Sequence, residues 1–270
     1  MAAEVVTLTG ACLAFGDRVL WDQLDLTVRA GEFIAVLGPN GTGKTSLLKV
    51  LLGEMPLSAG TALIEGRPVQ KGSDRIGYVP QHRAVDRGLS LRGSDMVRLG
   101  VDGHRWGVAP LRAATRRHRR DAVQQALSQV HAEALAKVAV GVMSGGELQR
   151  VRIAQALASD PALLLCDEPL LNLDPANARL VAGLIDRRRQ TGTAVIFVTH
   201  EVNPVLPFVD RILYLVNGHF RIGTVAEVMT SQTLSELYQA DIQVVEVGGR
   251  YVVLGEHLDH SGHTHGHSHE

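Results

Sequence analysis

The chain has 270 residues, of which 45% are hydrophobic, so it can bury the core of one large domain or two smaller ones. Its 27 lysines and arginines nearly balance 28 aspartates and glutamates, which argues against a general nucleic-acid-binding protein. No apolar run approaches the length of a membrane span, and the start of the chain lacks the basic and apolar segments of a signal peptide. Cys12 and Cys166 lie far apart in apolar segments, so we expect both to be buried, reduced thiols, as in the cytosol.

Residues 4–37 are predicted to form strands, the last of which is a short apolar run over residues 32–37. Phe15 falls in a predicted turn between two of these strands. An aromatic side chain on such a turn can stack on a purine ring, but it can equally belong to the core. The residue pattern leaves both interpretations open.

A glycine-rich loop, Gly38–Ser46, follows the apolar run and fits the pattern G-x-x-x-x-G-K-[ST]. A helix is predicted directly after it, over residues 46–52, with Gly53 as its stop. Strand, loop and helix in this order form a phosphate cradle, because the glycines let successive N–H groups point inward and the helix N-terminus favours anions. Lys44 would reach the β- and γ-phosphates of a nucleotide, and the Thr45 hydroxyl would bind Mg²⁺. The predicted nucleotide-binding residues of the loop are Gly38, Asn40, Gly41, Gly43, Lys44, Thr45 and Ser46.

Further strands are predicted over residues 57–80, where Pro80 ends the last of them and leaves Gln81 at the mouth of a loop. The Gln81 amide could bind a metal through its oxygen or orient a water molecule. Over residues 82–142 the composition shifts to Ala, Leu, Gln and Arg, and we predict a helical subdomain, inserted into an α/β core at about residues 82–158. The basic run Arg116–Arg120 within it is better explained as a solvated helix face than as a contact with anionic lipid or a partner.

Ser144, Gly145 and Gly146 precede a predicted helix in which Ser144 would be the N-cap. The two glycines would expose backbone N–H groups, which makes a second anion-binding helix terminus in the chain. The signal is weak by itself, because Ser-Gly-Gly is also an ordinary linker sequence.

An apolar strand over residues 162–166 ends in two carboxylates, Asp167 and Glu168. Two carboxylates beside a core need a cation or hydrogen-bond donors to hold them there. Asp167 could hold Mg²⁺ opposite Thr45, and Glu168 could orient or deprotonate a water molecule.

A further buried strand is predicted over residues 193–199, and His200 stands at its C-terminal end. Ligands of open α/β sheets bind outside the carboxyl ends of the strands. Because Lys44, Asp167, Glu168 and His200 all follow such strands, the sequence predicts one catalytic crevice formed by these residues.

Together the motifs resemble the ATPases of ABC transporters, and the resemblance runs from about Val5 to Gly223. It implies an α/β fold, a P-loop NTPase cassette with a mixed core sheet, an N-terminal antiparallel β subdomain and an inserted α-helical subdomain. It identifies Leu163–Glu168 as the Walker B strand and Phe15 as the aromatic residue that stacks on adenine. The catalytic residues implied are Glu168, Gln81 and the switch histidine His200, and the D-loop aspartate Asp174 is implied to belong to the nucleotide-binding residues.

In this family two cassettes stack head to tail, and each ATP lies between the phosphate loop of one copy and the signature of the other. The resemblance therefore implies a homodimer in which Ser144, Gly145 and Gly146 contact the γ-phosphate bound to the partner. The signature departs from the commoner pattern at Met143 and Glu147, which replace Leu and Gln. Glu147 adds a negative charge near a phosphate.

Residues 224–255 are predicted to contain two short helices and a hairpin around Gly248-Gly249, an ending that resembles cassettes of zinc and manganese uptake systems. In residues 256–270 the histidines are separated mainly by Gly, Ser, Thr, Asp and Glu, so the segment cannot form a core and is predicted to be a disordered tail. We interpret the tail as metal-interacting, with zinc as a candidate ion, over the alternatives of an expression tag or a merely soluble extension. Its histidines are His257, His260, His263, His265, His267 and His269.

The resemblance implies an ATP-binding and hydrolysing subunit, with Mg²⁺, of an importer for a divalent metal ion, zinc or manganese. Such a subunit sits on the cytoplasmic face of the cell membrane, binds a polytopic permease, and serves an extracytoplasmic metal-binding protein indirectly, with no nucleic-acid partner. The alternative is a soluble, non-transport ABC ATPase of translation, repair or metal-sensing regulation. Translation types usually carry two cassettes and repair types insert long coiled coils, and the sequence contains neither.

Overall fold

The computed structural model describes residues 2–81, 90–102 and 113–255. The six tail histidines predicted to bind metal lie outside the described residues. Among the residues that are described, no helix is both long and apolar enough to cross a membrane.

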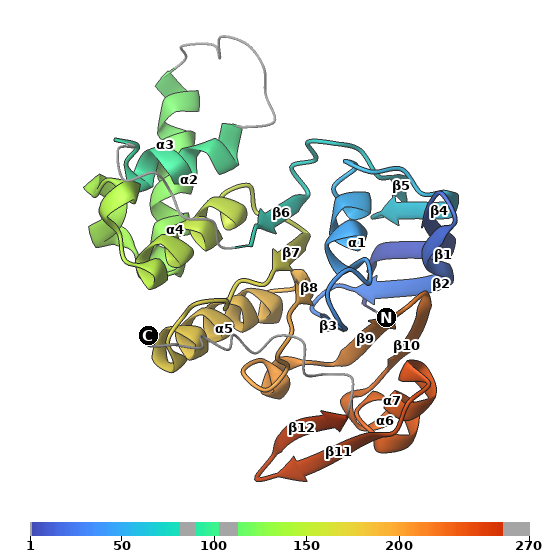
Figure 1. The fold of residues 1–270 in the computed structure, drawn as a ribbon. Coiled ribbons are helices and arrows are strands. Elements are labelled where there is room, and N and C mark those ends of the chain that lie inside the picture. Colours follow the sequence, from blue (N-terminus) through green and yellow to red (C-terminus); the bar gives the residue numbers. More distant parts are fainter. Residues whose placement is uncertain (1, 82–89, 103–112, 256–270) are drawn as a thin grey trace, which may run out of the picture.

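The centre of the molecule is a six-stranded sheet with the order β10-β9-β3-β8-β7-β6 (Figure 1). The strands from β9 to β6 run parallel, and only β10 is antiparallel to its neighbour. β3, β7 and β8 are buried along their whole length, because helices or another sheet cover both faces of the sheet. The strands are β3 (Phe33–Leu37), β6 (Ile76–Val79), β7 (Leu163–Asp167), β8 (Ala194–Val198), β9 (Arg211–Val216) and β10 (His219–Gly223).

An antiparallel four-stranded sheet with the order β2-β1-β4-β5 forms the N-terminal layer. Its buried face and the helix α1 pack on one side of the central sheet, where Ile34 and Val36 of β3 point. The alternation of side chains along β3 sends its remaining residues to the other side. The elements of this layer are β1 (Glu4–Phe15), β2 (Arg18–Arg29), α1 (Lys44–Leu51), β4 (Ala59–Ile64) and β5 (Arg67–Pro68).

The second core lies on the opposite face of the central sheet, where Phe33, Ala35 and Leu37 meet α5 and the helical subdomain. Within that subdomain, Ala126 and Leu127 of the helix α3 are buried, as on the apolar face of an amphipathic helix. The elements are α2 (Gly93–Asp102), α3 (Ala113–Gln129), η1 (Glu133–Lys137), η2 (Val140–Val142), α4 (Gly145–Leu157) and α5 (Pro175–Gln190).

The C-terminal segment packs against the same second core, through Val228, Leu234 and Ile242. It ends in a hairpin whose turn residues, Gly248 and Gly249, have φ values of 58° and 73°. Two successive residues with positive φ fit a tight two-residue hairpin turn, which glycine adopts at low cost. Besides β9 and β10, the elements that follow β8 are η3 (Leu206–Phe208), α6 (Val225–Val228), α7 (Ser231–Tyr238), β11 (Ile242–Val247) and β12 (Arg250–Gly255).

The two cysteines have different surroundings. Cys166 is buried in β7 as predicted, but Cys12 is only half-buried, so the prediction of a buried thiol is wrong for Cys12. Its neighbours Ala11 and Leu13 are buried, and the alternation of side chains along β1 therefore turns Cys12 toward the outer face of the sheet.

Candidate active site

The glycine loop predicted to bind phosphate connects β3 to α1. Gly38, Gly41 and Gly43 have φ values of 137°, 79° and 98°, a backbone region that other residues rarely adopt. A Cβ atom at Gly38 would lie 2.0 Å from the carbonyl oxygen of Leu215, so no larger residue fits there. The loop therefore has the curled backbone that a phosphate cradle requires.

Lys44 lies at the start of α1 and is only 5% exposed. Its ammonium donates to the carbonyl oxygens of Gly38, at 2.6 Å, and Pro39, at 2.7 Å. Burial lowers the pKa of Lys44, although the nearby charges of Glu168 and Asp167 oppose that shift. An ammonium has three donors, so one remains to bind a phosphate oxygen beside the loop.

Asp167 ends β7 and accepts a hydrogen bond from the Thr45 hydroxyl over 3.3 Å. Burial raises the pKa of the Asp167 carboxyl, and the hydrogen bond from Thr45 partly offsets that effect. Two hard oxygen donors at this spacing suit Mg²⁺, whose octahedral ligands lie about 3 Å apart along an edge. A cation here would also balance the carboxylate that burial destabilises.

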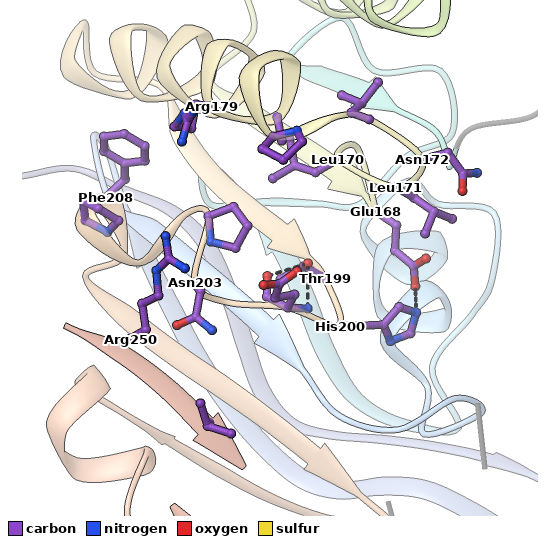
Figure 2. Close-up of a pocket in the computed structure, with 17 residues that line it drawn as sticks. Glu168, Leu170, Leu171, Asn172, Arg179, Thr199, His200, Asn203, Phe208 and Arg250 are labelled. Atoms are coloured by element: carbon purple, nitrogen blue, oxygen red, sulfur yellow. Dashed lines mark hydrogen bonds and ion pairs between the residues drawn. The ribbon is translucent and has the colours of Figure 1, made fainter. Parts of the chain in front are cut away.

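Residues from three strand ends meet at Glu168. Its carboxylate accepts a hydrogen bond of 2.8 Å from the Gln81 amide, after β6. The same carboxylate pairs with the His200 ring, after β8, as Figure 2 shows. The backbone of Glu168 has a φ of 48°, a strained value for a residue with a side chain. The strain and both partners fix the direction of one carboxylate, which is what a general base needs. The predicted crevice residues Lys44, Asp167, Glu168 and His200 thus lie at neighbouring strand ends, and Gln81 joins them.

The predicted signature begins α4. Ser144 is the N-cap, as predicted, and forms a capping box with Glu147. The Glu147 carboxylate accepts from the Ser144 N–H at 2.9 Å and from the Ser144 hydroxyl at 2.8 Å. These two hydrogen bonds lower the pKa of Glu147, and the bond from the backbone N–H has the larger effect. The unusual acid at position 147 therefore stabilises the start of its own helix.

Asp174 is the N-cap of α5, and Pro175 is the first residue of the helix. The Asp174 carboxylate accepts from the backbone N–H of Ala176 and of Asn177, each at 3.0 Å, and from the Asn177 side chain. A Cβ atom at Gly146 would lie 2.6 Å from the Asn177 side-chain oxygen. Asn177, which the sequence did not point to, therefore connects the signature to the start of α5.

Phe15 ends β1 with 51% of its surface exposed, which excludes its alternative interpretation as a core aromatic. The partner of Phe15 in the strand ladder is Arg18, and the Arg18 guanidinium donates to the Gly41 carbonyl oxygen over 2.7 Å. An exposed ring and a cation thus lie beside the phosphate loop. Arg18 is a candidate nucleotide contact that sequence reasoning missed, because only the fold brings it to the loop.

The signature lies apart from these residues. In Figure 1 α4 belongs to the helical subdomain, whereas α1 and the phosphate loop lie across the central sheet beside the N-terminal layer. One chain therefore unites Lys44, Thr45, Asp167, Glu168 and His200, but it does not bring Ser144, Gly145 or Gly146 to its own phosphate loop.

A cavity of about 970 Å³ lies beside Glu168 and His200, both of which line it (Figure 2). Its walls come from the start of α5, from the loop that contains η3, and from β12. The phosphate loop, which is described in full, contributes none of the lining residues, so the cavity and the phosphate cradle are distinct parts of the site.

A family model described as ABC transporter matches residues 21–171. The manganese transport system ATP-binding protein MntB of Listeria innocua is 30% identical over 233 residues, which is 86% of this chain and 95% of MntB. The zinc transport system ATP-binding protein TroB of Treponema pallidum is 32% identical over 238 residues, 87% of each chain.

Solved structures are similar as well. A metal-chelate type ABC transporter in an inward-facing conformation has a TM-score of 0.78 at 27% identity, over 94% of this chain and 98% of that chain. The dimeric, post-hydrolysis ATP-binding cassette MJ0796, bound to ADP and phosphate, has a TM-score of 0.65 at 26% identity, over 82% and 98%. The predicted fold class is confirmed by these structures and by the mixed sheet, antiparallel layer and helices described above. The chain belongs to the ABC transporter family, as one of its ATP-hydrolysing cassettes.

Proposed function

We propose that this chain is the ATPase subunit that powers uptake of a divalent metal ion, zinc or manganese, through a polytopic membrane permease. The observation that carries the proposal is the placement of Glu168, fixed by Gln81 and His200 beside Lys44 and Asp167. The choice of metal rests on the names of the manganese and zinc transport relatives. An extracytoplasmic metal-binding protein would deliver the ion to the permease, and this subunit would bind the permease from the cytoplasmic face.

In this proposal the loop glycines and Lys44 bind the β- and γ-phosphates of ATP, and Phe15 stacks on adenine. Thr45 and Asp167, with Gln81, would hold Mg²⁺, which would neutralise phosphate charge. Glu168 takes a proton from the attacking water, and His200 holds the Glu168 carboxylate in place. The loop glycines in this proposal are Gly38, Gly41 and Gly43, and Asn40 and Ser46 provide further contacts with the nucleotide.

Cassettes of this family dimerise, and the separation of signature and phosphate loop within one chain supports the same arrangement here. Ser144 and the N–H groups of Gly145 and Gly146 would bind the γ-phosphate held by a second copy. Asp174 would act at the same contact through the start of α5. Each dimer would then contain two equivalent sites.

Removal of the Glu168 carboxylate tests the hydrolytic role. Glu168→Gln should keep ATP binding, lower turnover by about 10²–10⁴-fold, and trap a dimer with ATP, because only the proton acceptor is lost. ATP affinity and hydrolysis rate of the purified subunit measure the two effects separately. Hydrolysis at the parental rate would exclude Glu168 as the base.

Transport is tested with the permease that co-purifies with the subunit. In liposomes that contain the complex, ATP should drive accumulation of Zn²⁺ or Mn²⁺, and the Glu168→Gln complex should accumulate neither. If the active complex hydrolyses ATP but moves neither ion, the ATPase assignment stands and the metal assignment fails.

A further inference from the structure

The C-terminal hairpin has an apolar outer face. Side chains alternate along β11 and β12, and Val244, Tyr251 and Val253 point inward to the second core. The outward residues are Gln243, Val245, Val247, Arg250, Val252 and Leu254. The four apolar residues among them are 41%, 63%, 44% and 52% exposed in chain order. The outer face of a solvated hairpin is normally polar, so these exposed valines and leucine indicate a surface that another molecule covers.

Hydrogen bonds hold the hairpin in a fixed position. The Asn203 side chain donates to the carbonyl oxygen of Tyr251 and accepts from its N–H, both over 2.9 Å. The N–H of Val244 donates to the Ser231 hydroxyl, also over 2.9 Å. The exposed apolar face is therefore presented on a rigid element. Asn203 lies three residues after His200, so the hairpin is joined to the loop that carries the switch histidine.

The outer face continues into the cavity beside Glu168. Arg250 and Val252 line that cavity together with Leu171, which is itself 38% exposed (Figure 2). An apolar surface thus extends from the loop before α5, past the catalytic residues, to the end of the hairpin. Residues of both charge signs line the cavity, because Arg179 and Arg250 are cationic and Glu201 is anionic.

We infer that this outer face is an interface with a second copy of the chain, additional to the ATP-binding contacts. In the proposed function the phosphate loop meets the signature of a second copy, and Glu168 lies close to Lys44 of that loop, so the surface around Glu168 would face the same copy; to this extent the inference rests on the proposed function. The hairpin face is continuous with that surface, so the same copy reaches it. A twofold-symmetric contact uses the same patch on both copies, which suits a patch that carries both cationic and anionic residues.

Charged substitutions on the outer face test the inference. Val247→Lys and Leu254→Lys, each in the full-length Glu168→Gln subunit, should weaken the ATP-bound dimer by about tenfold or more, because an apolar contact cannot pair the buried ammonium. Leu99→Lys is the matched control, since Leu99 is 54% exposed, on α2. Dissociation constants come from sedimentation velocity with ATP. Thermal unfolding and ATP affinity of each variant should match those of the parent.

Val245→Thr and Val247→Thr provide near-isosteric variants that keep strand propensity and should weaken the dimer by a smaller factor. Equal dimer affinity in parent and hairpin variants would overturn the inference, and so would an equal loss with Leu99→Lys. If the hairpin variants form dimers of parental affinity but no longer retain the permease, the inference is also overturned, and the outer face is then a contact with the permease. A parent that stays monomeric with ATP would overturn the proposed function and the inference together, whereas a parent dimer that hairpin variants leave unchanged would overturn the inference alone.

Discussion

At the scale of single residues, the buried Asp167 carboxyl lowers the stability of the folded chain at neutral pH, although the proposed Mg²⁺ site requires it. Burial raises the pKa of its carboxyl, so the folded state holds the proton more tightly than the unfolded chain does. Above that raised pKa, the ionised form lowers the free energy of unfolding. As the pH falls through the raised pKa toward the ordinary value for aspartate, protonation removes this penalty.

Asp167→Asn should therefore raise the melting temperature of the nucleotide-free subunit at neutral pH. A gain of 1 kcal/mol corresponds to about 2 °C for a chain of this size. The difference from the parent should shrink at acidic pH, and it should reverse with Mg²⁺ and ATP, because the amide binds the cation poorly. Calorimetry at two pH values, with and without Mg²⁺-ATP, makes the comparison. An Asn variant that is less stable than the parent without ligand would contradict the prediction.

At the scale of elements, the start of α5 is the junction between signature and catalytic loop. The Asp174 carboxylate binds the first N–H groups of the helix and the Asn177 side chain, which also contacts Gly146. Its role in its own chain is therefore that of a cap, whatever it contributes across the dimer.

Two substitutions separate these roles. Asp174→Ala removes the cap and should lower the melting temperature by a few degrees, whereas Asp174→Asn retains a capping oxygen and should stay close to the parent. If the charge of Asp174 also acts across the dimer, the Asn variant should be stable but slower in ATP hydrolysis. Thermal scans and turnover of both variants distinguish the two effects. Equal stability of the Ala variant and the parent would exclude the cap as a stabilising element.

At the scale of the whole molecule, the last described element is β12, which ends at Gly255, and the histidine-rich tail follows it in the sequence. We expect deletion of residues 257–270 to leave basal ATP hydrolysis almost unchanged and to lower the stoichiometry of bound Zn²⁺. Binding must order the segment, so its affinity should be modest, and it should weaken as the pH falls through about 6.5, where imidazole becomes protonated.

Calorimetric titration of the full-length and truncated chains with Zn²⁺ measures the effect. Replacement of the six tail histidines by serine provides a control of equal length. Equal zinc uptake by all three proteins would exclude the tail as a metal site, and the metal assignment would then rest on the relatives alone.

The sequence by itself determined those features whose signals are local. The glycine spacing predicted the phosphate loop, Ser144 was recognised as a cap from the residues that follow it, and the apolar runs before Glu168 and His200 predicted the strands of the central sheet. Each of these signals depends on a few consecutive residues, because capping and glycine turns are satisfied within one turn of backbone.

The strand ends also predicted that Lys44, Asp167, Glu168 and His200 share one crevice, but only the tertiary structure decided which distant side chains pair. Parallel pairing of β6, β7 and β8 brings Gln81 and His200 to the Glu168 carboxylate, and the β1–β2 hairpin brings Arg18 to Gly41. The structure also shows that Cys12 faces outward and that, in the part of the chain it describes, the outer face of the last hairpin is exposed. The alternation of residues along a strand indicates that its two faces differ in polarity. Which face is buried depends on the layers that pack against the strand, and those layers come from parts of the chain that are distant in sequence.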